Sequence, residues 1–239
     1  MFNLWKSKKN VLGDLGPLYH DYRFFGVRNE QLPGIFQANQ QAKFPILLAY
    51  ISLAIAKCRH NASAPVTFTE LFCADGFYTM LATKLGADQC VGIDSNKDGF
   101  LDSAAGIAQR LEIDNARFIR QEISGNSVFA PADIVANLGG LYHVADPRPV
   151  LEMSYRTARR FLIVQNVVSL ASDDEEYFAA PAPGWSWGNR YSRQSFAKLI
   201  RDLGYRVIDS HFNILAGNDR PEDQGSVYYL IAKEGSGQP

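Results

Sequence analysis

The sequence is poor in cysteine and lacks a long uninterrupted hydrophobic run. Its three cysteines, Cys58, Cys73 and Cys90, each lie in or beside an apolar segment. An odd, small number of cysteines argues against a disulfide framework and indicates reduced thiols in a hydrophobic core. The longest apolar run, Phe44 to Cys58, is too short to span a bilayer, and we expect a buried helix there. The opening MFNLWKSKKN has charges but no apolar stretch after it, so no secretory signal is predicted.

An excess of charge of either sign is also lacking. The 24 basic residues nearly balance the 25 acidic ones, and the formal net charge is -1. Nucleic acids and anionic membranes attract strongly basic proteins, so neither is expected as a partner, although a local basic patch would not alter the total. Together with the reduced thiols, this balance favours a cytoplasmic protein. The hydrophobic fraction of 46% is enough for one globular unit with a sizeable core.

Glycine is scarce where a nucleotide-binding turn would need it. In ELFCADGFYT, Glu70 to Thr79, a strand-like segment runs into a helix-like one across a turn with a single glycine. A turn that binds a pyrophosphate uses three glycines, which permit the tight bend and the close approach of the phosphate. Phe72 and Ala74 occupy two of those positions and only Gly76 remains. The sequence therefore disfavours NAD and FAD.

Strand-like and helix-like segments alternate from about Pro65 onward, which predicts a parallel sheet covered on both faces. The predicted strands in this part are Val66 to Cys73, Gln89 to Asp94, Ala116 to Ile123, Ala132 to Leu138 and Arg159 to Ser169. Two further strand-like runs, 205–213 and 226–234, are joined by a turn-rich stretch without a helix, so we expect antiparallel neighbours. The predicted fold class is α/β, with a Rossmann-like, seven-stranded, mostly parallel sheet whose last strand is antiparallel.

The alternation of strand-like and helix-like segments predicts three parts of the chain. Residues 1–62 lie outside the alternation and form a helical segment that is either a packing layer or a lid over the site. Residues 63–234 form the α/β domain, and the Gly- and Ser-containing tail 235–239 is expected to be disordered.

S-adenosylmethionine is the other common ligand of such a strand–turn–helix junction. It has no phosphate and presents an amine, a carboxylate, a sulfonium and a ribose. An acidic residue that ends the first strand can engage the amine directly or through water, and free N–H groups at the start of a helix can receive the carboxylate. Glu70, Ala74 and Gly76 fit these tasks.

This stretch resembles motif I of the class I S-adenosylmethionine-dependent methyltransferases, usually acidic-x-G-x-G-x-G, with Phe72 and Ala74 in place of the first two glycines and Asp75 before the third. The resemblance implies a carboxylate on the ribose hydroxyls at the end of the second strand. VGIDSN supplies Asp94 there, followed by Ser95. Asp94 comes 94 − 70 = 24 residues after Glu70, which is the length of one helix and two turns.

Two later segments extend the resemblance. FIRQEIS offers Gln121 and Glu122 where the family places a polar residue on the adenine amino group. The fourth strand carries Asn137 and continues into NLGGLYHVADP, which is similar to the family's LxHxxDP loop. The four motifs in this order, over roughly residues 65–234, imply S-adenosylmethionine as the cofactor.

Methyl transfer from a sulfonium requires mainly that acceptor and methyl group be held in line. A hydroxyl acceptor also needs a base within hydrogen-bond reach. Tyr142 and His143 are the candidate catalytic residues because they follow the fourth strand, at the edge where open α/β sheets bind ligands. The alternative is that His143 only bonds the backbone or packs over the cofactor.

Two aromatic segments are candidates for binding the acceptor. His20, Tyr22 and Arg23 can close over it, or the same stretch can be core packing with a solvated arginine. Trp185, Trp187 and Arg190 in GWSWGNRYS form an amphipathic wall for a ring-bearing small molecule, or a loop anchored on the core. Cys58 and His60 are too isolated for a metal site, and no metal is predicted.

The sequence thus predicts an S-adenosylmethionine-dependent methyltransferase that acts on a small-molecule acceptor at oxygen or nitrogen. One alternative is a tRNA wobble-uridine-type modifying enzyme, because LYHVADP is similar to a loop of those enzymes, although they need a basic RNA surface. Another is a methyltransferase-like protein that binds without catalysing. The sequence leaves the acceptor and the oligomeric state open.

Overall fold

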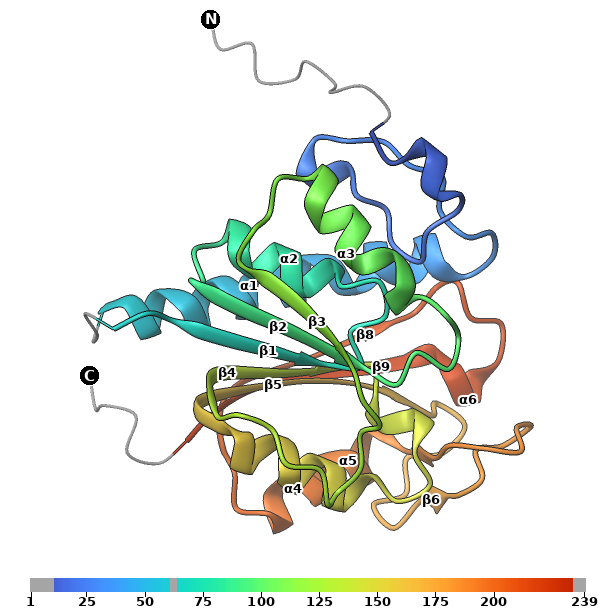
Figure 1. Cartoon of the computed structure of the whole chain (residues 1–239). Coiled ribbons are helices and arrows are strands. Elements are labelled where there is room, and N and C mark those ends of the chain that lie inside the picture. Colours follow the sequence, from blue (N-terminus) through green and yellow to red (C-terminus); the bar gives the residue numbers. More distant parts are fainter. Residues whose placement is uncertain (1–10, 61–63, 234–239) are drawn as a thin grey trace, which may run out of the picture.

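The computed structural model of the chain describes residues 11–60 and 64–233. Its centre is a seven-stranded sheet in the order β3-β2-β1-β4-β5-β9-β8 (Figure 1). The strands are β1 Thr67–Leu71, β2 Gln89–Asp94, β3 Ala116–Arg120, β4 Ala132–Leu138, β5 Ala158–Val168, β8 Arg206–Ile214 and β9 Gly225–Ala232. All neighbours are parallel except β9, which runs antiparallel to both β5 and β8. The predicted fold class is confirmed.

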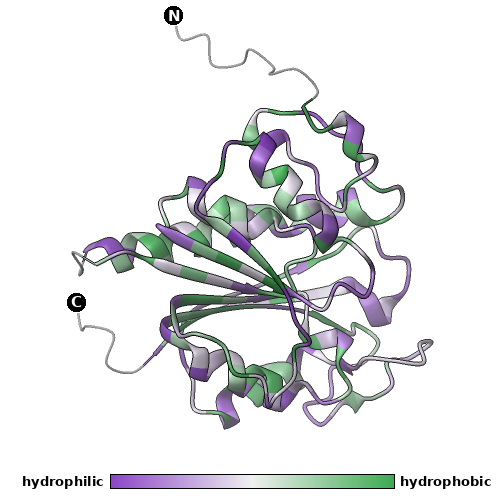
Figure 2. Ribbon diagram, viewed as in Figure 1, coloured by the Kyte–Doolittle hydropathy of each residue, from purple (hydrophilic) through white to green (hydrophobic). Residues whose placement is uncertain are grey.

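Helices cover both faces of this sheet. They are α1 Phe36–His60, α2 Phe77–Lys84, α3 Leu101–Arg110, α4 Pro147–Thr157, α5 Arg193–Asp202 and α6 Pro221–Gln224. In Figure 1, α1, α2 and α3 lie above the sheet, and α4 and α5 lie below it. Each layer encloses its own core cluster, and Figure 2 shows the hydrophobic residues concentrated along the central strands between them. Cys58, Cys73 and Cys90 are buried, as predicted.

The described part of the N-terminal segment belongs to the upper layer. Leu12, Leu18, Tyr22 and Val27 are buried in the same cluster as α1, α2 and the sheet. The segment includes the short turns η1 Gly13–Leu15 and η2 Arg23–Phe25. It is therefore packed on the α/β domain along its length. The predicted boundary at 62/63 and the tail 235–239 lie outside the described residues.

Helix α1 differs from the prediction in length. It has 25 residues and, by length and composition alone, is long and apolar enough to cross a membrane, so the argument that the run is too short is wrong. In the structure the helix packs on the sheet, with a third of its apolar window buried (33%). Polar contacts hold it there: Tyr50 donates to Asp209, and Arg160 donates to the carbonyls of Lys57 and Cys58 at its last turn.

Two short elements were not predicted. The turn-rich link before β9 contains α6, although no helix was expected there. The Trp-containing stretch is flanked by a two-stranded ribbon, β6 Phe178–Ala179 with β7 Arg190–Tyr191. Both elements are too short to leave a periodic pattern in the sequence.

Gly76 fixes the junction between β1 and α2. Its φ is +80°, and an added Cβ would lie 2.2 Å from the ring of Phe118 on β3. Glycine is therefore required both for the left-handed conformation and for the close approach of β3.

Two glycine-to-alanine variants separate these requirements. Gly204 also has a positive φ, +66°, but nothing lies within 4 Å of an added Cβ. We expect Gly204→Ala to cost about 1 kcal/mol of unfolding free energy, and Gly76→Ala at least about 3 kcal/mol because overpacking adds to the backbone strain. Urea denaturation measures both. Equal losses would contradict the contact with Phe118.

Candidate functional site

The candidate site lies where β1, β2 and β4 end side by side. Leu71, the last residue of β1, pairs with Ile93 of β2 on one side and with Asn137 of β4 on the other. The turn of residues 72–76 therefore leaves the sheet between the ends of its two neighbours. Ligands of open α/β sheets bind at this edge.

The 72–76 turn keeps a glycine-type backbone without its glycines. Phe72, Ala74 and Gly76 have φ values of +62°, +48° and +80°. A non-glycine residue in the left-handed region costs about 1–2 kcal/mol, so contacts around Phe72 and Ala74 must hold the turn in shape. The ring of Phe72 packs on the loop after β4, where a Cβ on Gly140 would lie 1.8 Å from it. Phe72 thus replaces the flexibility of a glycine with packing.

Asp94 holds the other side of the turn. Its Oδ2 accepts the N–H of Ala74 at 3.0 Å, and its Oδ1 accepts the N–H of Asn96 at 2.7 Å. Each carboxylate oxygen keeps a second lone pair, and the side chain is only half-buried. Asp94 can therefore bond a vicinal diol while it holds Ala74. Ser95, which follows it, is also half-buried.

Glu70 lies beneath the turn. It is buried, and the hydroxyl of Thr79 in the first turn of α2 donates to its Oε2 at 2.5 Å. Burial raises the pKa of Glu70 to about 8, although hydrogen bonds from the side chain and backbone of Thr79 oppose the rise. Its position supports the start of α2, so an interaction with a ligand amine would need a mediator.

Asp75 joins the turn to the N-terminal segment. Its Oδ2 accepts the N–H of His20 at 2.9 Å, and its Oδ1 lies 2.5 Å from His20 Nδ1. The hydroxyl of Tyr22 donates to the carbonyl of Asp75 at 3.0 Å. Both carboxylate oxygens are thus occupied within the protein, which explains why this buried acid is accommodated.

These contacts decide between the two readings of the N-terminal segment. Tyr22 is fully buried and His20 is 8% exposed, so neither presents a free side chain to an acceptor in this structure. Arg23 lies on the surface and pairs with Asp21. The prediction that these residues bind the acceptor is corrected for Tyr22, because aromatic contacts with Phe25 and Phe77 place it in the core.

The loop after β4 is fixed by the Trp-containing stretch. Asn189 donates from Nδ2 to the carbonyls of Leu141 and Val144 at 2.6 and 2.7 Å, and its N–H donates to the carbonyl of Tyr142. Gly188 has a φ of +70°, and an added Cβ would lie 2.4 Å from the carbonyl oxygen of Tyr142. The two segments therefore form one rigid wall.

Trp187 and His143 meet on this wall. Their rings stack at 5.1 Å with an angle of 8°, and the ring of Tyr142 lies 4.3 Å from that of His143. Both His143 and Trp187 keep exposed edges. Packing of the ring against the protein, followed by the positive charges of Arg190 and Lys43, lowers the pKa of His143 below its ordinary value. The imidazole is therefore neutral at pH 7.

Arg190, which is predicted to bind the acceptor, is buried in an ion pair. It is 3% exposed, and its guanidinium contacts Oδ1 of Asp223 at 2.8 Å through Nε and 2.6 Å through a terminal nitrogen. Its partner lies 33 residues further along the chain. Trp185 stays at the surface, where it packs against Trp187 and donates to Asp223 at 3.4 Å. Asp223 thus anchors the stretch.

Three other predicted residues lie around the edge of the site. Gln121 and Glu122 are exposed after β3, and Glu122 pairs with Lys97 at 3.4 Å. Asn137 is fully buried beneath the β4 end, where its Nδ2 donates to Ser154 of α4 and its Oδ1 has no partner among the described residues. Asn137 therefore stabilises the end of β4 through its contact with α4.

The prediction missed Tyr19 and Lys43. The ring of Tyr19 packs on Phe36 and Phe100 at 5.0 and 4.9 Å. Burial raises the pKa of its hydroxyl, and the neighbouring Tyr142, Asp75, Asp98 and Asp94 add to the rise. Burial lowers the pKa of Lys43 on α1 to about 8. The positive charge of Lys43 also contributes to the lowered pKa of His143. The alternation of YHDY contains Tyr19, but nothing local marks Lys43.

Comparison with known proteins gives matches only at the level of structure. No protein-family model matches the chain, and no relative is found among curated proteins. The N-terminal domain of EvdMO1 with SAH bound is similar with a TM-score of 0.61 and 16% identity, over 92% of this chain and 93% of that one. Magnesium protoporphyrin IX methyltransferase (ChlM) from Synechocystis PCC 6803 with bound SAH gives 0.58 and 13%, over 85% and 89%.

The chain therefore has the class I methyltransferase fold. The [4+2]-cyclase SpnF is also similar, with a TM-score of 0.57 and 13% identity over 77% of this chain and 80% of that one. Because one fold serves both a methyltransferase and a cyclase, activity must be argued from the site.

Glu70 gives the site a testable dependence of stability on pH. Its folded pKa of about 8 lies above the unfolded value, so the folded state binds the extra proton and stability falls as pH rises through this range. Glu70→Gln, which mimics the protonated acid, should gain more than about 1 kcal/mol of unfolding free energy relative to the parent between pH 5 and 9. Chemical denaturation at both pH values measures this. A difference that does not change with pH would contradict a protonated Glu70.

Proposed function

We propose that the protein is an S-adenosylmethionine-dependent methyltransferase that acts on a small-molecule acceptor at oxygen or nitrogen. The observation that carries the proposal is the turn of residues 72–76, which is left-handed at Phe72, Ala74 and Gly76 and tied through Ala74 to Asp94. The buried thiols and balanced charge support a cytoplasmic protein with no membrane or nucleic-acid partner.

The residues around the turn fit this cofactor in charge and in hydrogen bonding. Asp75 and Asp94 lie at the turn, and Glu70 lies beneath it, where it accepts from Thr79. The aspartates repel a pyrophosphate and suit a ligand that carries a sulfonium and an ammonium. Asp94 would accept hydrogen bonds from the two ribose hydroxyls. The N–H groups of the turn would donate to the carboxylate of the cofactor. The cofactor supplies an activated methyl group when it is bound.

His143 and Trp187 supply the wall against which an acceptor would be placed. The stacked pair offers a flat, partly exposed surface of the kind that binds a ring. With its lowered pKa, His143 is neutral but a weak base. We assign it a positioning role, which favours an acceptor that reacts without a strong base, such as an amine or an acidic hydroxyl. Alignment then provides most of the rate enhancement.

A second candidate is a methyltransferase-like protein that binds the cofactor or another metabolite without methyl transfer. The bulky Phe72 at the turn supports it, and so does the similarity to SpnF, described as a [4+2]-cyclase. The alternative that the protein modifies tRNA is supported by the LYHVADP loop alone.

Three acceptor sets distinguish these functions. The purified protein is incubated with methyl-labelled S-adenosylmethionine and, in turn, small phenols and amines, bulk tRNA, or no acceptor. Formation of S-adenosylhomocysteine with a small acceptor is the expected result. Transfer to tRNA alone would replace the proposal by the tRNA alternative, and cofactor binding without transfer would favour the non-catalytic protein.

Asp94→Ala tests the assignment of the ribose. Charge-assisted hydrogen bonds contribute roughly 1.5–3 kcal/mol each, so we expect the affinity for S-adenosylhomocysteine to fall about 10- to 100-fold or more. Calorimetry measures the affinity, and Asp114→Ala, at an exposed aspartate, is the matched control. A thermal melt checks that the turn survives the loss of the Ala74 contact. Unchanged binding would place the ribose elsewhere.

His143→Ala tests the positioning role. Loss of a general base costs about 10²–10⁴-fold in rate, whereas loss of one wall of the site should raise KM and lower kcat by less than about tenfold. The parent should show no change in kcat/KM attributable to His143 between pH 6 and 8, because its pKa lies below that range. A large fall in kcat, with a new pH dependence, would make His143 the base.

A further inference from the structure

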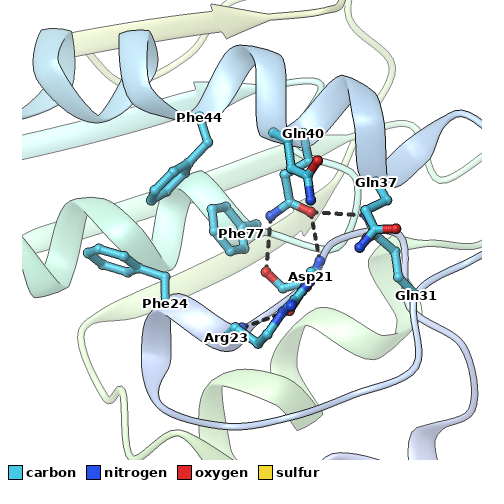
Figure 3. A pocket seen from close by; sticks show the side chains of 9 residues that line it. Asp21, Arg23, Phe24, Gln31, Gln37, Gln40, Phe44 and Phe77 are labelled. Carbon is cyan, nitrogen blue, oxygen red and sulfur yellow. Dashed lines mark hydrogen bonds and ion pairs between the residues drawn. The ribbon is translucent and has the colours of Figure 1, made fainter. Parts of the chain in front are cut away.

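A hollow lies between the N-terminal segment and the first turns of α1, apart from the strand-end site. It has a volume of about 130 Å³ and is open to solvent. Figure 3 shows three phenyl groups, Phe24, Phe44 and Phe77, on one side and glutamine side chains on the other. Phe24 is 45% exposed, although its ring packs on Phe44 at 5.2 Å. An exposed ring beside a hollow leaves apolar surface for a ligand to cover.

The glutamines around the hollow differ in how many hydrogen bonds their side chains make within the protein. Gln40 is fully engaged: its Oε1 accepts from the N–H of Asp21 and from Gln31, and its Nε2 donates to the carbonyl of Asp21. Gln31 donates twice, while its buried Oε1 has no partner among the described residues. The side chains of Gln37 and Gln41 are exposed on α1 and make no hydrogen bond to any described residue. The rim thus offers free donors and acceptors around a fixed framework.

The charge of the hollow is balanced. Asp21 and Arg23 are its charged lining residues, and they pair with each other through two contacts. A charged ligand would have to compete with this pair, whereas a neutral one would not. The lining therefore selects a neutral molecule that combines an aromatic ring with a hydrogen-bonding group.

We propose that this hollow is a second small-molecule site, and that it binds a neutral, single-ring aromatic compound with a carboxamide or similar group. A cavity of about 150 Å³ lined by apolar side chains is known to hold benzene, so the volume here suits one six-membered ring. The ring packs among Phe24, Phe44 and Phe77, and the carboxamide bonds Gln37 and Gln41 at the rim.

The second site is separate from the strand-end site, but Phe77 connects it to the 72–76 turn. Its lining contains none of Asp94, Tyr142 and His143. Phe77 is the first residue of α2, directly after the turn, and its ring stacks with that of His20 at 4.9 Å. A ligand beside Phe77 therefore lies one residue layer away from His20, which holds Asp75.

Benzamide is the probe, titrated into the full chain without cofactor and followed by backbone amide chemical shifts. A ligand of this size binds with a Kd of about 1 mM. We expect shifts at residues 21–44 and at Phe77, weaker binding of cyclohexanecarboxamide, and still weaker binding of benzoate. The titration needs no cofactor, so its failure would leave the proposed methyl transfer untouched.

Two matched pairs of variants locate the site. Phe24→Ala and Gln41→Ala should each raise the Kd for benzamide at least about fivefold, by loss of a ring contact or a hydrogen bond. Phe178→Ala, at a ring that is 46% exposed, and Gln109→Ala, at an exposed position of α3, should leave it within about twofold. Absence of shifts in residues 21–44, equal effects of all four variants, or competition by S-adenosylhomocysteine would each overturn the proposal.

Discussion

The contact between Asp75 and His20 is the constraint on which the site depends. A buried aspartate at the tip of the 72–76 turn has both oxygens taken by one histidine, through the backbone N–H and the ring. The contact spans 55 residues of sequence and ties the N-terminal segment to the sheet. Because Phe72 and Ala74 lack the freedom of glycine, the turn is held from outside: by His20 and Tyr22 above, by Asp94 at the side and by the packing of Phe72 on Gly140. Contacts from other segments therefore hold the backbone conformation that glycines would adopt without strain.

Local sequence patterns predict several strands and the residues at their ends. β2 and β4 were predicted with the observed bounds, because both are short apolar runs bounded by turn residues. The antiparallel β9 followed from the lack of a long helix before it. Asp94, Tyr142 and His143 are predicted from their positions at strand ends, and Trp187 from the aromatic stretch after β5, which are both local signals. The fold and the location of the site were therefore predictable.

The partners of polar residues were not predictable, since they are set by contacts distant in sequence. The sequence predicts Arg190 as a ligand-binding residue, but the structure pairs it with Asp223. For Tyr22 the sequence leaves both acceptor binding and core packing open, and the structure places its hydroxyl on the carbonyl of Asp75. Tyr19 packs on His20, Phe36 and Phe100 only because the fold brings these rings together. A single sequence shows which groups exist, but the fold decides which remain free.

The central claim is that the turn and Asp94 bind a cationic, phosphate-free adenosine cofactor. Calorimetric titration of the unmodified chain with S-adenosylmethionine, S-adenosylhomocysteine and NAD tests it most directly. We expect micromolar binding of the first two ligands at one site and no binding of NAD, because the aspartates at the turn repel a pyrophosphate. Binding of NAD, or of none of the three, would contradict it and would mean that Phe72 closes the turn to this class of ligand.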